Sequence, residues 1–218
     1  MKKSEIYKFM EILQDEYKNW EAPVVTLMAN RGASAFEILV STILSLRTKD
    51  EVTIEASKRI DAVADTPQKM IKLSEEEISK LIYPVGFYKR KATQLKEISK
   101  ILLTKYSGKV PNTIEELLEL PGVGRKTANL VMVEGHKLEG LCVDTHVHRI
   151  SNRIGYVKTK NPEQTEFALR ENLPKQYWVN YNEILVAFGQ ILCRPISPHC
   201  TICKVESICQ KVGVDKFR

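Results

Sequence analysis

The chain has 218 residues and a formal net charge of +6 at pH 7, and its hydrophobic and charged fractions, 43% and 28%, are those of an ordinary globular protein. No apolar run approaches the roughly 20 residues of a membrane span, and the N-terminus lacks the apolar core and cleavage site of a signal peptide. These features argue against membrane and secreted proteins, so we expect an intracellular protein. The positive charge favours a polyanionic partner such as nucleic acid.

Helical periodicity runs through almost the whole sequence, and no alternating strand pattern or internal repeat interrupts it. The first predicted helix carries a stripe of apolar residues at helical spacing: Ile6, Phe9, Met10, Leu13, Tyr17 and Trp20. Further helices are predicted at residues 34–46, 50–65, 74–82, 87–106, 113–120, 145–154, 162–172 and 177–193. Capping patterns mark several of their starts: Ser34 with Glu37, Ser74 with Glu77, Thr113 with Glu116, and Asn161 before Pro162. The predicted fold class is therefore all-α, with an irregular cysteine-rich tail.

Between a short predicted helix and a helix that begins at Arg125 stands a tight turn, Pro-Gly-Val-Gly, at residues 121–124. Its two glycines tolerate positive φ and leave backbone N–H groups uncovered, while the following helix adds the positive end of its dipole. Such a turn is typical of a helix-hairpin-helix, which grips the phosphates of DNA without reading the sequence. The candidate phosphate contacts are Gly122, Val123, Gly124 and Arg125. A plain corner between two helices fits equally well, so the turn alone leaves both interpretations open.

Two ionisable residues stand where they could perform chemistry. Lys126 falls in the first turn of the helix after the hairpin turn, where the positive helix end and partial burial both disfavour the ammonium form. A larger neutral fraction makes a lysine amine a nucleophile of the Schiff-base type, although a simple phosphate contact is the alternative. Asp144 precedes another predicted helix and would cap it, and a cap is held rigidly enough to act as a base or to stabilise positive charge.

Together these motifs resemble the endonuclease III family, whose members are DNA repair glycosylases of the helix-hairpin-helix superfamily. The segments that match in order and spacing are ILVSTILSLRTKD, VGFYKRKA, PNTIEELLELPGVGRKTAN, VDTHVHR and a four-cysteine tail, and they cover nearly the whole chain. The hairpin by itself occurs in many DNA-binding proteins. The hairpin combined with Lys126, Asp144 and the cysteines is highly specific.

The resemblance implies a bifunctional DNA glycosylase and apurinic/apyrimidinic lyase of base excision repair that removes oxidised pyrimidines. Its partner would be double-stranded DNA with a damaged base or an abasic site, and the damaged base would flip out of the duplex. Lys126 matches the family's nucleophile, which would form a Schiff base with C1′ and lead to cleavage on the 3′ side of the abasic site by β-elimination. Asp144 matches the family's essential carboxylate.

Two alternative functions stay open at this point. Mismatch thymine and adenine glycosylases of the same superfamily remove the base with activated water and generally lack lysine at the position of Lys126, which disfavours them. A non-catalytic DNA-binding protein whose iron–sulfur cluster carries electrons or senses redox state is the more distant alternative.

Two further positions match residues with which the family contacts DNA. Arg47 stands where the family often has a glutamine that fills the gap left by the flipped base; arginine can stack and donate hydrogen bonds, so the filling role is retained and the opposite-base preference is put in doubt. Phe87 matches a position where the family inserts an apolar wedge into the base stack, and a core phenylalanine fits it equally well. The neighbouring Lys89, Arg90 and Lys91 are interpreted as a solvated helix face, with DNA backbone contacts as the alternative.

Four of the five cysteines form the pattern C-x6-C-x2-C-x5-C, at Cys193, Cys200, Cys203 and Cys209. In a chain without a secretion signal, this density predicts a metal site rather than disulfides. Spacing alone fits either zinc or an iron–sulfur cluster. The resemblance implies a [4Fe–4S] cluster in a loop at residues 190–210, with a structural role that presents Lys204 to phosphate. The fifth cysteine, Cys142, is expected to be a buried and inert thiol.

By the family pattern, the chain should form two helical lobes. Residues 28–138 would make a six-helix barrel lobe that carries the hairpin, and residues 1–27 with 139–218 would make a second lobe that carries the cluster loop. Lys126 would come from the first lobe and Asp144 from the second. We expect the protein to act as a monomer.

Overall fold

The computed structural model describes all 218 residues and contains helices but no strands, which confirms the predicted all-α class. The chain divides into two compact units, Val24–Gly140 and the pair of segments Met1–Pro23 and Leu141–Arg218. None of the helices combines the length and the hydrophobicity needed to cross a membrane.

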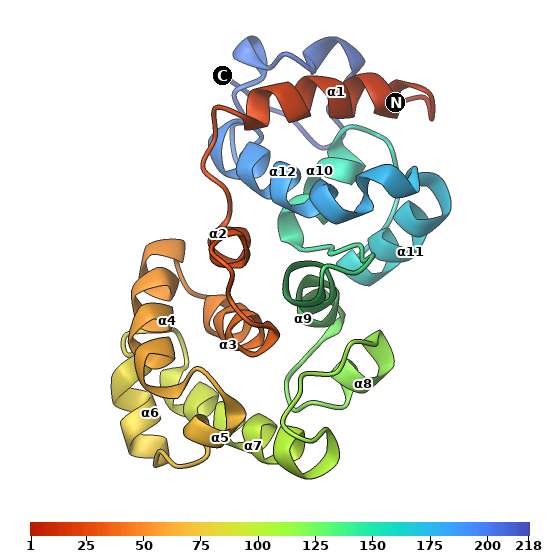
Figure 1. The fold of residues 1–218 in the computed structure, drawn as a ribbon. Helices are drawn as coiled ribbons and strands as arrows, with labels where there is room; N and C mark the ends of the chain where they lie inside the picture. The colour runs from red at the N-terminus through yellow and green to blue at the C-terminus, as the bar shows by residue number, and fades with distance from the viewer. The chain divides into compact units, whose positions relative to one another are not determined.

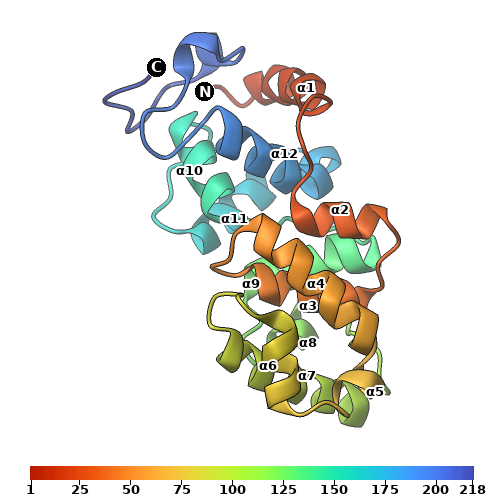
Figure 2. The same cartoon turned by 90° about the vertical axis from the view of Figure 1, so that its left-hand side faces the viewer.

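The unit Val24–Gly140 is built around its most apolar helix, α3, which packs against α4, α7, α9 and the π-helical segment η1. Figure 2 shows α6 lying beside α7 and α4, in agreement with their contacts. The elements are α2 (Val24–Asn30), α3 (Ala35–Ser45), α4 (Asp50–Ala64), α5 (Pro67–Met70), α6 (Glu75–Ile82), α7 (Tyr88–Lys105), α8 (Ile114–Leu118), α9 (Arg125–Leu130) and η1 (Val131–Gly135). Burial of α3 on nearly all sides makes it the frame on which the neighbouring loops are fixed.

The predicted start signals form real caps. In α3, the amide of Glu37 donates to Ser34 Oγ over 3.3 Å and the amide of Ser34 donates to Glu37 Oε2 over 2.7 Å, a reciprocal capping box. The pair Ser74 and Glu77 opens α6 in the same way. A cap of this kind is worth about 1 kcal/mol, so these pairs fix where each helix begins.

The other unit joins the N-terminal helix α1 (Glu5–Tyr17) to α10 (Thr145–Arg153), α11 (Pro162–Asn172) and α12 (Trp178–Ile191). Figure 1 shows α1 lying along α12, and the two helices are in contact. Phe188 is central to this packing: its ring meets Phe9 edge-on with centroids 6.5 Å apart and stacks on Trp20 at 6.0 Å. The predicted stripe is buried from Ile6 to Leu13, whereas Tyr17 is the last residue of α1 and Trp20 lies beyond its end, and both are only partly buried.

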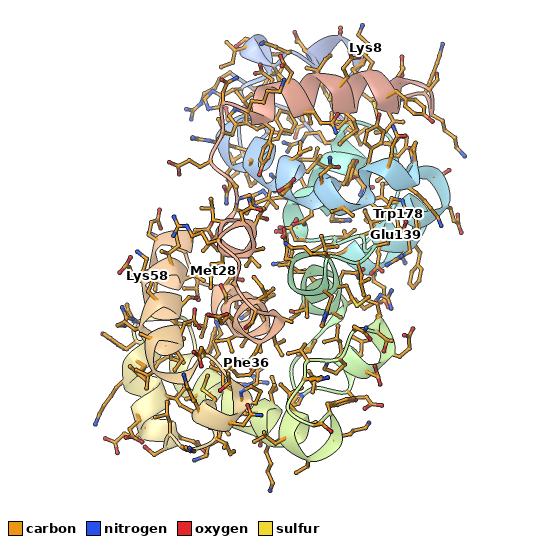
Figure 3. The ribbon with its side chains drawn as sticks, in the orientation of Figure 1. Lys8, Met28, Phe36, Lys58, Glu139 and Trp178 are labelled. Atoms are coloured by element: carbon orange, nitrogen blue, oxygen red, sulfur yellow. The ribbon has the colours of Figure 1, made fainter.

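One half-buried carboxyl gives the folding stability a pH dependence. Asp61 lines a cavity of about 380 Å³ with Met28 and Lys58, both labelled in Figure 3, and burial together with the charges of Glu37 and Asp65 raises the pKa of Asp61 from 3.8 to about 7. An unfolded chain ionises this group near pH 4. The stability that the raised pKa provides is therefore complete at low pH and lost as the pH rises through 7.

Replacing Asp61 with asparagine should remove this loss. The free energy of unfolding of Asp61→Asn, relative to wild type, should rise by roughly 1–2 kcal/mol between pH 5 and pH 8, after allowance for solvent screening at a half-buried site. Urea titrations at the two pH values measure this change. Asp215→Asn, at an exposed carboxyl, should show no comparable change, and an equal effect in both variants would contradict the assignment.

Candidate active site and cysteine loop

The hairpin turn lies between α8 and α9, and its two glycines differ in backbone conformation and surroundings. Gly122 has φ +70°, and a Cβ there would lie 2.5 Å from Gln94 Nε2, whose amide donates to the carbonyl of Pro121 over 2.8 Å. Gly124 is the N-cap residue of α9, has no side chain with which to cap it, and faces open space. Val123 is buried and anchors the turn. The backbone of the turn is therefore exposed at Gly124, while the buried side chain of Val123 fixes the turn to the unit.

Lys126 is the second residue of α9 and is half-buried. The residues that follow it in the helix are all buried: Thr127, Ala128, Asn129 and Leu130. The helix then continues as the π-helical segment η1, in which the buried Glu134 accepts a hydrogen bond from Thr26 Oγ1 over 2.7 Å. Lys126 thus stands at the half-buried start of an otherwise buried helix. The π-helical turn that follows is of a kind that occurs frequently at functional sites.

Asp144 is the N-cap of α10, as the sequence predicts. Its Oδ1 accepts hydrogen bonds from the amides of His146 and Val147, both over 2.9 Å. Both bonds go to the same oxygen, so Oδ2 takes no part in the cap. The carboxylate is therefore held rigidly by one oxygen, which is the geometry that a catalytic base or a charge-stabilising group requires. Asp144 belongs to one compact unit and Lys126 to the other.

The structure brings Arg47 and Phe87 together. The guanidinium carbon of Arg47 lies 5.7 Å from the centroid of the Phe87 ring, within the range of a cation–π contact. Both residues have left-handed backbones, with φ of 55° and 58°, which is uncommon for residues other than glycine. Phe87 is 62% exposed, so the alternative of a core phenylalanine is wrong.

Four cysteines of the C-terminal tail line one cavity. The cavity is walled by apolar side chains and by a few polar ones, and its cysteines are Cys193, Cys200, Cys203 and Cys209. Two N–H groups point at sulfur: Arg153 Nη1 lies 3.3 Å from Cys193 Sγ, and the amide of Lys211 lies 3.4 Å from Cys209 Sγ. None of the five cysteines forms a disulfide, and Cys142 is buried elsewhere in the unit, as expected. The donor set is therefore four thiols in an apolar shell with N–H donors to sulfur.

Three of the cysteines have raised thiol pKa values. Burial, with further repulsion from the neighbouring sulfurs, raises the pKa of Cys203 to about 11 and also raises the pKa values of Cys200 and Cys209. No three His, Cys, Asp or Glu side chains converge closely enough to hold a metal ion as they stand. Metal binding lowers thiol pKa values outright, so the set is suited to a cationic metal centre that spans the cavity.

Three basic residues have environments that the sequence did not show. Lys91 is only 5% exposed, so its interpretation as part of a solvated helix face is wrong. Lys204 pairs with Glu16, 2.5 Å from Nζ to Oε1, and its side chain is 64% exposed, so its contact with phosphate stays a prediction. Arg153, which the sequence did not single out, is buried and donates to Cys193 Sγ and to the carbonyls of Arg194 and Pro195. It fixes the cysteine loop to α10, and a lone arginine on a predicted helix gives no sequence signal of that role.

Comparison with known proteins identifies the family. The model of the HhH-GPD superfamily base excision DNA repair proteins matches residues 40–175. Endonuclease III of Thermotoga maritima is 50% identical over 181 residues, which cover 83% of this chain and 85% of that protein. Endonuclease III homolog 2 of Arabidopsis thaliana is 44% identical over 93% of this chain, which spans 56% of that relative's length.

A solved structure agrees with these sequence matches. The structure of a trapped endonuclease III–DNA covalent intermediate, an estranged-adenine complex, superposes with a TM-score of 0.87 at 29% identity, over 97% of each chain. Family model, sequence relative and solved structure thus point to the same group of enzymes. The chain therefore belongs to the endonuclease III family of helix-hairpin-helix DNA glycosylases in base excision repair.

Proposed function

We propose that the protein is a bifunctional glycosylase and apurinic/apyrimidinic lyase that removes oxidised pyrimidines from double-stranded DNA. The observation that carries this proposal is the position of Lys126, in the first turn of α9 directly after the hairpin turn. The trapped covalent complex of the structural relative is consistent with a nucleophile that bonds to DNA. A lysine amine at this position can form a covalent Schiff base with the sugar, whereas glycosylases that use activated water form no such bond.

In the proposed reaction, the neutral amine of Lys126 attacks C1′ of the flipped nucleotide, and the glycosidic bond breaks with its electron pair on the departing base. The attached amine loses one of its protons, the C1′–O4′ bond breaks with its electron pair on O4′, which takes up a proton, and a protonated Schiff base that keeps one N–H forms. Removal of a proton from C2′ then breaks the C3′–O bond and releases the 3′-side strand as a phosphate. Water hydrolyses the Schiff base and returns Lys126. Asp144 stabilises the positive charge that develops on the sugar and assists proton transfer.

The contacts to DNA would come from two surfaces of the unit Val24–Gly140. The hairpin turn, with Gly122, Gly124 and Arg125, would hold phosphates through backbone N–H groups and charge. Arg47 and Phe87 would enter the duplex where the flipped base leaves the stack, since apolar wedges and stacked guanidinium groups suit that space. Flipping costs a few kcal/mol, which such insertion offsets.

We also propose that the four tail cysteines hold a [4Fe–4S] cluster. One cavity lined by Cys193, Cys200, Cys203 and Cys209, with an apolar wall and N–H donors to sulfur, is the environment such clusters require. When bound, the cluster supplies cross-links between loop residues rather than a step of the reaction. The chain's own part is to supply four thiolates and to hold them with Arg153.

Replacing Cys203 with serine should therefore abolish iron and sulfide in anaerobically purified protein and lower the melting temperature by about 5 °C or more, because loss of a structural metal site typically costs several kcal/mol. Elemental analysis and thermal unfolding measure the two effects. Cys142→Ala is the matched control, since this buried thiol lies outside the cavity, and it should retain full iron. Zinc in place of iron and sulfide in the anaerobically purified wild-type protein would contradict the cluster.

A duplex with one 5-hydroxyuracil tests the reaction. The wild-type protein should release the base, cleave the strand on the 3′ side, and give a covalent adduct when borohydride is present. Base release without cleavage or adduct would instead support a monofunctional glycosylase, and absence of base release by cluster-loaded protein would support a DNA-binding protein without catalysis.

A further inference from the structure

Lys91 is the one lysine whose side chain is almost completely buried. It lies in the first turns of α7, and its ammonium group donates to the carbonyl of Leu44 over 2.9 Å, to the carbonyl of Leu46 over 2.6 Å and to Thr48 Oγ1 over 3.4 Å. Three acceptors therefore satisfy its three donors, and no carboxylate is among them. The positive charge sits at the C-terminal, negative end of α3, where the helix dipole favours it.

The acceptors of Lys91 flank Arg47 on both sides. Leu46 is the residue before Arg47 and Thr48 the residue after it, so the ammonium holds the backbone of this segment from within. Arg47 itself turns outward with φ 55°. A left-handed backbone at a non-glycine residue costs about 1–3 kcal/mol and persists only where its surroundings hold it. The hydrogen bonds from the buried Lys91 ammonium to Leu46 and Thr48 fix the backbone on either side of Arg47.

The side chain of Lys91 connects Phe87 to this segment through α7. Phe87 is the left-handed N-cap residue of α7, and its carbonyl accepts the main-chain amide of Lys91 over 3.0 Å in the first helical turn, so the ammonium contacts tie the start of α7 to the segment around Arg47. A second link joins the two segments directly, because the amide of Gly86 donates to Thr48 Oγ1 over 3.1 Å. A Cβ on Gly86 would lie 2.5 Å from the carbonyl oxygen of Arg47, so the two backbones are in contact.

These buried contacts connect two chain segments whose exposed side chains, Arg47 and Phe87, lie together on the surface. Arg47 and Phe87, called here the insertion pair, come from segments about forty residues apart in sequence, and their side chains meet on the surface in a cation–π contact. Lys91 belongs to the first turn of α7, which Phe87 caps, and its side chain bonds to the segment that carries Arg47. We propose that Lys91 is a positioning residue that holds Arg47 and Phe87 as a single DNA-inserting unit, which sets how strongly the protein distinguishes a vacated base position from intact duplex.

This inference rests on the proposed function, because it assigns insertion to Arg47 and Phe87. It differs from a general structural role in one respect: the effect of Lys91 on DNA should depend on the insertion pair being present. A lysine that merely stabilised the unit would affect binding to the same extent whether or not the pair were there.

The test measures affinity for a duplex with one tetrahydrofuran abasic analogue, which cannot form a Schiff base, and for the same duplex undamaged. Lys91→Met keeps the length of the side chain and removes its charge and donors. We expect Lys91→Met to lower the ratio of the two affinities on the order of tenfold, the scale of a lost buried charged hydrogen bond, with undamaged binding nearly unchanged. Lys100→Met, at an exposed position of the same helix, should leave the ratio within about twofold of wild type.

The decisive comparison repeats Lys91→Met in a background that lacks the pair, Arg47→Gly with Phe87→Gly, where glycine accepts the positive φ of both positions. There the further loss should be less than about twofold. A full tenfold loss in that background, or an unchanged ratio in folded Lys91→Met, would overturn the proposal. If Lys91→Met does not fold, Thr48→Val removes only the hydroxyl that links Gly86 to Lys91; it should lower the ratio about threefold, and an unchanged ratio would overturn the proposal equally.

Borohydride trapping on a natural abasic site distinguishes failure of the proposed role of Lys91 from failure of the proposed lyase activity. Wild type that forms the adduct but shows no preference for the analogue duplex would overturn the role of Lys91 and leave the lyase assignment intact. Wild type that forms no adduct and shows no preference would overturn both.

Discussion

Replacing Lys126 with alanine should abolish strand scission and the borohydride-trapped adduct. The proposed reaction needs an amine that bonds to C1′, and alanine offers none, so the loss should exceed about a thousandfold in the rate of cleavage at an abasic site. Lys126 is half-buried at the start of α9, and alanine is a good helix former, so the fold should persist. Single-turnover cleavage of an abasic duplex, with trapping of the same samples, measures the effect.

Two controls show whether the loss is specific to the Lys126 amine and whether DNA binding is retained. Lys100→Ala removes an exposed lysine from α7 and should trap as efficiently as wild type. Binding of Lys126→Ala to the tetrahydrofuran duplex should stay within a few-fold of wild type, because phosphate contacts and insertion do not depend on the amine. If Lys126→Ala still formed the adduct, the nucleophile would be another amine and the assignment would fail.

Replacing Asp144 with asparagine should separate its structural role from its chemical one. The amide oxygen of asparagine can still accept from the amides of His146 and Val147, and asparagine caps helices about as well as aspartate. The melting temperature should therefore stay within a few degrees, while base release falls about a hundredfold or more, because the negative charge and the proton acceptor are gone. Single-turnover release of 5-hydroxyuracil measures the rate.

Asp144→Ala provides the complementary variant. It removes the cap as well as the charge, so it should lose a further ~1 kcal/mol of stability without a further loss of rate beyond that of Asp144→Asn. A pattern in which the rates of the two variants follow their stabilities would mean that Asp144 acts only as a cap. Full activity of Asp144→Asn would contradict the chemical role.

The parts of the fold that follow from local pattern could be predicted. The stripe of α1 from Ile6 to Leu13, the capping boxes of α3 and α6, and the cap of α10 by Asp144 occur as the sequence indicates, because each depends on residues within one or two turns. The stripe was predicted to run on to Trp20, but α1 ends at Tyr17. The short helices α2 and α5 were not predicted: seven and four residues are too few for helical periodicity to show. The π-helical segment after α9 likewise has no local sequence signal.

The error over Lys91 has a specific cause. Three consecutive basic residues favour the interpretation of a solvated face, yet the residues at three- and four-residue spacing after Lys91, namely Leu95, Ile98 and Leu102, are all buried. The periodicity therefore placed Lys91 on the buried face, and its charge outweighed that signal. The left-handed backbones of Arg47 and Phe87 could not be predicted at all, because contacts between distant segments impose them.

The order in which the two compact units can fold follows from their connectivity. Val24–Gly140 is continuous and can fold once it has left the ribosome, whereas the other unit joins Met1–Pro23 to Leu141–Arg218. Helix α1 is made first, but the surface that buries Ile6, Phe9 and Leu13 includes α12, which is made near the end. At about 5–20 residues per second, the apolar face of α1 waits roughly ten to thirty seconds for its partner. During translation that apolar face stays exposed and is a candidate binding site for a chaperone.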